Sequence, residues 1–151
     1  MKMNDIKAVA ITVFTLINAR LGTLAPLVYL LLILQITDYI TGITAAPYRG
    51  ETRNSDKGFR GIAKKLCMLV LVGLGMALDW LLIYATSTIG IVAPVKCLFS
   101  ALVAVWLIAN EIISILENIG DIGVESPAFL LPMIQWVKQQ AEDKGKSNTE
   151  V

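Results

Sequence analysis

The sequence predicts an all-α membrane protein with three transmembrane helices, an N-terminal interfacial helix and a cytoplasmic C-terminal tail. The chain of 151 residues is 56% hydrophobic and 17% charged, whereas soluble domains average about 45–50% apolar and 25% charged residues. Its mean hydropathy is +0.67. The apolar residues also gather in runs of about 20, the length that crosses a bilayer. We therefore expect one small helical bundle.

We expect residues 1–22 to form an N-terminal interfacial segment. The stretch AVAITVFTLINA is too short to span, and Lys7 and Arg20 bracket it. Its polar residues are Thr12, Thr15 and Asn18. This pattern favours an amphipathic helix at the membrane surface over a disordered leader, which is the alternative. No A-x-A site follows, so we expect no cleavable signal peptide.

We expect residues 23–119 to form the transmembrane region. The expected spans are about 24–46, 66–86 and 91–110, the last with a helical extension to 118. Only the sequence STIG separates the second and third spans, which indicates a tight antiparallel hairpin.

We expect residues 120–151 to form a cytoplasmic tail. The stretch PAFLLPMIQWVK is apolar and contains Pro132, so we expect an interfacial segment with Trp136 at the lipid headgroups rather than a regular helix. From Lys138 onward the charged sequence is typical of a partly disordered end.

The loop between the first two spans sets the predicted orientation. Its basic residues are Arg49, Arg53, Lys57, Arg60, Lys64 and Lys65. Short basic loops stay in the cytoplasm, which places the amino terminus outside and the carboxyl terminus inside. Such residues at a membrane also meet anionic lipid, and we expect no nucleic-acid partner.

The first span carries a polar stripe that includes a buried aspartate. At 100° per residue, one half of the helix holds Gln35, Thr37, Asp38, Thr41, Gly42, Thr44 and Ala45. The other half, which we expect lipid to contact, holds Ile36, Tyr39, Ile40 and Ile43. A carboxylate at the centre of a membrane costs about 2.5–3.5 kcal/mol, so such stripes indicate helix packing or a water-filled cavity.

The third span carries a heptad seam of mostly small or polar residues. Its members are Ala93, Cys97, Ser100, Ala104, Leu107, Glu111, Ser114 and Asn118. Small residues let helix backbones approach closely in lipid. The seam predicts helix association, either within one chain or between subunits.

Two further charges lie in the second and third spans. Asp79 and Lys96 are each about 10 Å from the same end of the predicted hairpin. We expect them to pair, within or between hairpins, because pairing lessens the cost of burying either charge.

Catalysis and cofactor binding are not expected. The chain has no histidine, and no hydrolase, zinc or phosphate-loop motif occurs. The order of Asp38 and Tyr39 and the Met76 in GLGMALD depart from the pattern of intramembrane aspartyl proteases. Cys67 and Cys97 fall in apolar runs, where buried thiols are more typical than a disulfide. An oligomeric small-ion or proton-coupled transporter remains an alternative, although no repeat is present.

Four motifs in order resemble the phage holin family. They are DYITG, SDKGFRGIAKK, the second span with its late aspartate, and ANEIISILENIGDIGVESP, over roughly 28–127. The chain is most similar to the branch that includes clostridial toxin-secretion holins. The resemblance implies a homo-oligomer in the host cytoplasmic membrane that opens a lesion and releases an endolysin or a toxin. An antiholin is a further candidate partner, and an antiholin or passive scaffold is a further alternative for the chain itself.

For Asp38 the sequence supports two hypotheses. In the first, its stripe faces a subunit interface while the protein accumulates and faces water once a lesion opens. In the second, Asp38 pairs permanently with Arg49 or Lys64 as a static anchor.

Overall fold

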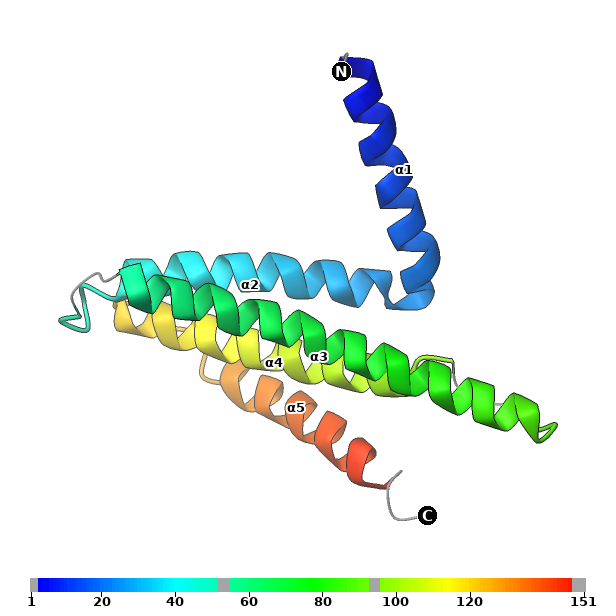
Figure 1. The fold of residues 1–151 in the computed structure, drawn as a ribbon. Coiled ribbons are helices and arrows are strands. Elements are labelled where there is room, and N and C mark those ends of the chain that lie inside the picture. Colours follow the sequence, from blue (N-terminus) through cyan, green and yellow to red (C-terminus); the bar gives the residue numbers. More distant parts are fainter. Residues whose placement is uncertain (1–2, 52–54, 93–95, 148–151) are drawn as a thin grey trace.

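The chain folds into helices joined by short turns. The computed structural model describes residues 3–51, 55–92 and 96–147, and this part of the chain contains no strand. In order, the helices are α1 (Met3–Leu21), the 3-10 helix η1 (Gly22–Leu24), α2 (Ala25–Ala45), α3 (Ser55–Thr88), α4 (Leu98–Asp121) and α5 (Leu130–Ser147). Figure 1 shows α2, α3 and α4 lying side by side along their length.

A glycine separates α1 from α2. Gly22 has a φ of 52°, which side-chain-bearing residues rarely adopt, and Pro26 lies in the first turn of α2. As a result α1 stands away from the bundle (Figure 1). Most of its described apolar side chains are exposed, although the ring of Phe14 stacks on Tyr29 with centroids 6.0 Å apart. The N-terminal segment is thus helical rather than a disordered leader, while its position at a membrane surface stays a prediction.

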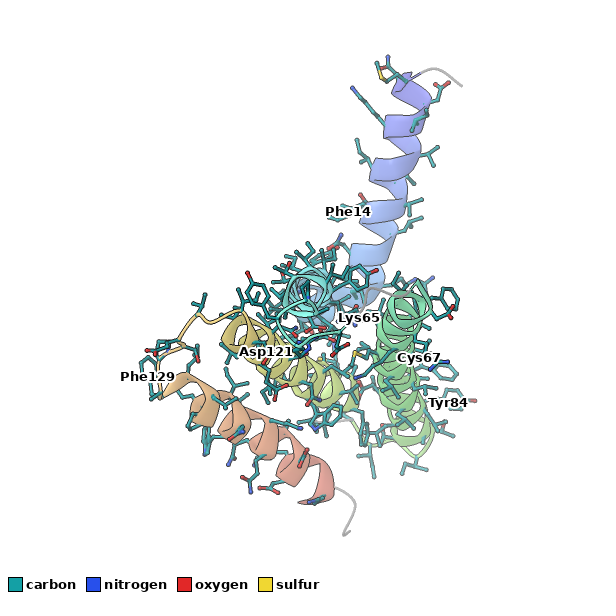
Figure 2. The ribbon with its side chains drawn as sticks, turned by 90° about the vertical axis from the view of Figure 1, so that its left-hand side faces the viewer. Phe14, Lys65, Cys67, Tyr84, Asp121 and Phe129 are labelled. Carbon is teal, nitrogen blue, oxygen red and sulfur yellow. The ribbon has the colours of Figure 1, made fainter. Side chains whose placement is uncertain are left out.

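Helix α4 is the central element of the bundle. It packs against α2, α3 and α5, whereas α2 and α3 contact each other little. The core lies along α4, where Ala104 and Leu107 are buried against Leu31 of α2 and Val72 of α3. In Figure 2 α5 lies on the side of α4 away from α2.

The prediction of three membrane-spanning helices is confirmed in length and composition. Three helical stretches of the described chain are long and apolar enough to cross a bilayer, namely Met3–Ala45, Gly58–Thr88 and Leu98–Ile122. On α2, the side chains of Ile36, Ile40 and Ile43 are exposed, as expected for a face that contacts lipid. Tyr39 differs from them, because its ring lies next to Gly58 and Gly61 of α3.

The helix boundaries differ from the predicted spans in α3 and α4. Helix α3 is 34 residues long because it continues the second span back to Ser55. Helix α4 begins at Leu98, not near Ile91, so the connection is longer than the sequence STIG. Residues 93–95 lie outside the described part.

The prediction for the tail was wrong in one respect. Residues 130–147 form the regular helix α5, which packs on α4. Pro132 does not prevent this, because it lies in the first turn, where the amide that proline lacks would have no helical partner. Trp136 is exposed on α5, and its contact with lipid headgroups stays a prediction.

Candidate functional site

Three helices bring charged side chains together inside the bundle. Lys65 of α3 lies between two carboxylates, with its Nζ 2.8 Å from Oδ2 of Asp38 on α2 and 2.6 Å from Oε2 of Glu111 on α4. Asn118 of α4 donates from Nδ2 to Oδ1 of Asp38 at 3.0 Å and to the hydroxyl of Thr41 at 3.2 Å. We call Asp38, Lys65, Glu111 and Asn118 the polar cluster; Lys65 is labelled at its centre in Figure 2.

The polar cluster is shielded from solvent but its charge is not balanced. The side chain of Glu111 is 3% exposed, and those of Lys65 and Asp38 are 16% and 18% exposed. Two carboxylates share one ammonium, so the net charge is −1. Burial of charges away from water is costly unless partners and hydrogen bonds compensate. The cluster therefore joins the three helices through contacts that depend on one another.

Residues around the cluster extend it along the helices. Gln35 is buried and donates from Nε2 to the backbone oxygen of Lys65 at 3.2 Å, which adds a second link between α2 and α3. Gly42 faces Asn118, since a Cβ there would lie 3.6 Å from its Nδ2. Thr37 instead donates to the oxygen of Ile33 in its own helix and takes no part in the cluster.

Arg49 closes the same end of the bundle. Its Nη1 lies 2.8 Å from Oδ2 of Asp121 and 3.1 Å from Oδ1 of Asn118, and its Nε lies 3.0 Å from Oε1 of Glu51. The hydrogen bonds to Asp121 and Glu51 raise the pKa of Arg49 above its already high ordinary value. The guanidinium therefore stays charged and ties the loop after α2 to the end of α4.

These contacts revise the partners predicted for Asp38. Asp38 pairs with Lys65, not with Arg49 or Lys64, and the pairing is within one chain. Lys65 had been assigned only to the basic loop. Of the other residues of that loop, Arg60 and Lys64 are exposed on α3, while Arg53 and the side chain of Lys57 lie outside the described residues.

The second buried carboxylate, Asp79, binds the start of α4. Its Oδ1 accepts from the backbone N–H of Phe99 at 2.8 Å, and its Oδ2 accepts from the N–H and the hydroxyl of Ser100 at 2.9 and 2.5 Å. These N–H groups have no helical partner at a helix N-terminus, and the side chain of Cys97 does not cap them. Asp79 thus serves as the N-cap of α4 from a neighbouring helix.

Gly75 makes this arrangement possible. A Cβ at position 75 would lie 2.8 Å from Cα of Ser100, so α4 approaches α3 closely only because residue 75 has no side chain. Gly75 lies one turn before Asp79 on α3, so the close approach and the hydrogen bonds to the start of α4 occur at the same level.

The pair of Asp79 and Lys96 is not formed within the chain. Lys96 is exposed and precedes the first residue of α4, whereas the oxygens of Asp79 are engaged by Phe99 and Ser100. Asp79 and Lys96 were predicted at the same depth in the membrane. Depth alone does not determine whether a carboxylate binds a lysine or backbone N–H groups.

The heptad seam faces the other helices of the same chain. Ser100, Ala104, Leu107, Glu111 and Asn118 are buried, and Cys97 and Ser114 are partly buried; Ala93 lies outside the described residues. Burial within one chain accounts for the small side chains at these positions. The seam as a contact between subunits stays a prediction.

Sequence reasoning missed the contact between α4 and α5. Nε1 of Trp106 donates to Oε1 of Glu142 at 2.6 Å, and Nζ of Lys138 lies 5.2 Å from the centre of the Trp106 ring. The spacing of Lys138, Ala141 and Glu142, which places them on one helix face, was the available signal. Ala141, on the same face of α5, is buried.

The described side chains at both ends of α4 form ion pairs and hydrogen bonds. Within residues 3–51, 55–92 and 96–147, no group of histidine, cysteine, aspartate or glutamate is placed to hold a metal ion. The two aspartates named above have separate partners at different ends of α4. The arrangement is a helix bundle held together in part by buried charge.

Comparison with known proteins identifies the family. The model of the bacteriophage holin family matches residues 15–139. The uncharacterized protein Lmo0128 of Listeria monocytogenes is 35% identical over 113 residues, which cover 75% of this chain and 72% of that protein. The uncharacterized protein BH0965 of Halalkalibacterium halodurans is 35% identical, with coverage of 74% and 78%.

A probable holin of Bacillus phage phi105 is 27% identical over 115 residues, which cover 76% of each protein. No solved structure matches the chain significantly. The family match spans most of the helices described above, from the end of α1 into α5. The chain belongs to the bacteriophage holin family.

Proposed function

We propose that the protein is a holin that oligomerises in the bacterial cytoplasmic membrane and opens lesions. The lesions release an endolysin or, as in the branch that the sequence resembles, a toxin. Family membership and the likeness to a probable holin support this role. The observation that carries it is the polar cluster, which buries three charged side chains between helices whose outer faces are apolar.

The polar cluster supplies a physical basis for two states. In the closed protomer, Asp38, Lys65 and Glu111 neutralise one another in part between the helices. When α2 or α3 moves away from α4, the same groups reach water, which hydrates their charges individually. A lesion lined by these groups is therefore wet, while the exposed isoleucines of α2 keep their contact with lipid. We propose that the switch lies inside each protomer rather than at a subunit interface.

We also propose the orientation that the basic loop predicts. The amino terminus lies outside and the loop of residues 47–65 and the carboxyl terminus lie inside, following the excess of basic residues in that loop. The polar cluster then lies near the cytoplasmic face, and the Asp79 site lies near the outer face. Reporter fusions at Ser55 test this: an external reporter signal there would contradict the proposed orientation.

Expression in a bacterium with and without a cytoplasmic endolysin tests the function. We expect an abrupt loss of membrane potential in both strains and lysis only where the endolysin is present. An unchanged potential together with proton-coupled solute uptake would favour a transporter. Stable oligomers with neither effect would favour a passive scaffold.

The time at which lesions open distinguishes the two hypotheses for Asp38, a switch and a static anchor. Asp38→Asn keeps an acceptor for Asn118 but removes one of the two charges that hold Lys65, the one that links α2 to α3. We expect this variant to insert and accumulate normally and to trigger earlier than the wild type, because its closed state is weaker. Thr37→Val is the matched control, since Thr37 bonds only within its own helix. Defective insertion of Asp38→Asn would support the anchor, and wild-type timing would exclude both roles.

A further inference from the structure

Helix α5 lies beside the part of α4 that is apolar and long enough to cross a membrane. It runs back along α4 from the turn after Asp121 (Figure 1), and its Glu142 accepts the hydrogen bond from Trp106. Trp106 precedes Asp121 by about 15 residues, or about 22 Å along the helix axis. Since the hydrocarbon core is about 30 Å thick, an α4 that spans the membrane places this contact within the bilayer.

The sequence of α5 does not suit that position. Among the described residues, three helical stretches are apolar enough to cross a bilayer, and α5 is not one of them. Its charged residues are Lys138, Glu142, Asp143, Lys144 and Lys146. Charged side chains in hydrocarbon are costly, and in lipid two apolar helix faces lose the hydrophobic gain that holds them together in water. The packing of α5 on α4 and the insertion of α4 into a bilayer therefore exclude each other.

The departure of α5 uncovers one face of α4. Between residues 98 and 116 no side chain of α4 is exposed, because α2, α3 and α5 surround the helix. At 100° per residue, one line of apolar side chains lies opposite to the heptad seam, and we call it the back face of α4. Its members are Leu102, Trp106, Ala109 and Ile113. Ala109 is 2% exposed although it points away from α2 and α3, so α5 covers this face.

Trp106 loses its hydrogen-bond acceptor when α5 leaves. Its indole N–H donates to Glu142 in the described chain, and acyl chains offer no acceptor in its place. Asn110 lies one turn further along α4, next to Trp106, and its side-chain amide forms no hydrogen bond within the described residues. The back face of α4 therefore suits a partner that offers polar groups at the same depth, which lipid does not.

A second copy of the chain offers those groups. Copies in one membrane share one orientation, so Trp106 of one copy lies within one helical turn of the depth of Asn110 of the other. An asparagine amide both donates and accepts hydrogen bonds. Ala109 lies on the same face, and its small side chain lets two helices approach closely.

We propose that the back face of α4 binds the same face of a second copy once α5 has left it. Trp106 of each copy then donates to the side chain of Asn110 of the other. This interface rests on the oligomerisation proposed above and specifies the surface through which it occurs. Outside a bilayer, α5 occupies the surface and keeps the chains apart.

Single thiols in an otherwise cysteine-free chain test the release of α5. The background is Cys67→Ser/Cys97→Ser, and Asp143→Cys adds a thiol at an exposed position of α5. In inverted membrane vesicles, a membrane-impermeant maleimide should label it as fast as Glu125→Cys in the turn before α5. Val70→Cys is the unlabelled control, because Val70 is exposed on the apolar part of α3, which faces lipid.

The control in the turn also identifies the side of the membrane on which the tail lies. If Glu125→Cys is labelled only in vesicles of the opposite orientation, the comparison with Asp143→Cys is made in those vesicles. The release of α5 is thus tested whichever way the chain is inserted. Labelling of Asp143→Cys as slow as that of Val70→Cys would mean that α5 stays on α4 and would overturn the proposal.

Oxidative cross-linking in the same vesicles tests the interface. Ala109→Cys should form disulfide-linked dimers, whereas Val70→Cys should form few. Trp106→Phe keeps an aromatic ring but removes the N–H, and it should weaken the dimerisation measured at position 109 about tenfold, as expected for the loss of one hydrogen bond. Trp80→Phe is the matched control, because Trp80 is exposed on α3, and it should dimerise as the parent chain does.

Two results of the cross-linking would overturn the interface. They are equal cross-linking at positions 109 and 70, which indicates random collision, and equal effects of Trp106→Phe and Trp80→Phe. The holin role is measured separately by the loss of membrane potential. Lesions that open without cross-links at position 109 would contradict this interface alone. Cross-links at that position without lesions would support the interface and contradict the holin role.

Discussion

The two buried carboxylate sites on α4 satisfy their charges in different ways. Near the start of α4, Asp79 accepts hydrogen bonds from backbone N–H groups, and Gly75 permits the close backbone approach that this needs. Toward the other end, Asp38 and Glu111 share the flexible side chain of Lys65. A backbone cap leaves little freedom, whereas a lysine can exchange partners. The end with Asp79 therefore holds α3 to α4 through fixed backbone contacts, whereas the end with the polar cluster holds the helices through one flexible side chain.

Loss of the shared cation should have the largest effect. Lys65→Met leaves two buried carboxylates without a partner, and breaking a buried pair in this way costs about 3–5 kcal/mol of unfolding free energy. The measurement is unfolding in detergent micelles, followed by circular dichroism. Lys64→Met is the control and should change stability by less than about 0.5 kcal/mol, because Lys64 is exposed. Equal effects would mean that the polar cluster is not a stabilising unit.

Loss of the Asp79 charge at the start of α4 should have the second-largest effect on stability. Asp79→Asn keeps one acceptor but loses the charge that faces the N-terminus of α4, which should cost about 1.5–3 kcal/mol. Lys96→Gln should be neutral in the same unfolding assay. The double variant should equal the sum of the single variants; a coupling energy above about 1 kcal/mol would restore the Asp79–Lys96 pair.

The close approach at Gly75 can be tested without touching a charge. Gly75→Ala introduces a Cβ 2.8 Å from Cα of Ser100, so the helices must separate, and overpacking of this kind costs about 1–3 kcal/mol. Gly73→Ala is a matched control on the same helix, because nothing lies within 4 Å of its Cβ. If both glycines tolerate alanine equally, α3 and α4 are not held at this distance.

The smallest effect is expected at α5. Glu142→Gln weakens the hydrogen bond from Trp106, which should cost about 1 kcal/mol or less and release α5 locally. Amide hydrogen exchange should become faster in residues 130–147 and stay unchanged in α2. Unchanged exchange in α5 would show that its packing does not depend on this bond.

The sequence predicted the bundle better than it predicted the partners within it. Helical periodicity placed Asp38, Thr41 and Gly42 on one face and the isoleucines on the other, because periodicity follows from backbone geometry alone. The choice of Lys65 over Lys64 as the partner of Asp38 depends on the rotation of α3 about its own axis. No pattern within α2 contains that information.

The tail prediction and the prediction of an Asp79–Lys96 pair within one chain failed for the same physical reason. The pairing of Asp79 with Lys96 was inferred from depth, but α4 begins after Lys96 and offers its free N–H groups to the carboxylate. The tail was judged irregular because of Pro132, although proline is compatible with the first turn of a helix. In both cases the position of a helix start decided the outcome, and helix starts are poorly determined by hydropathy.

The central place of α4 has a mechanical consequence. Helices α2 and α3 pack on α4 and hardly on each other. Each is therefore held in the bundle mainly by its own contact with α4. In lipid, separating two apolar helices exposes no surface to water, since acyl chains replace the lost contacts. The separation of α2 and α3 from α4 is therefore opposed by a few polar contacts and by the lateral pressure of the bilayer.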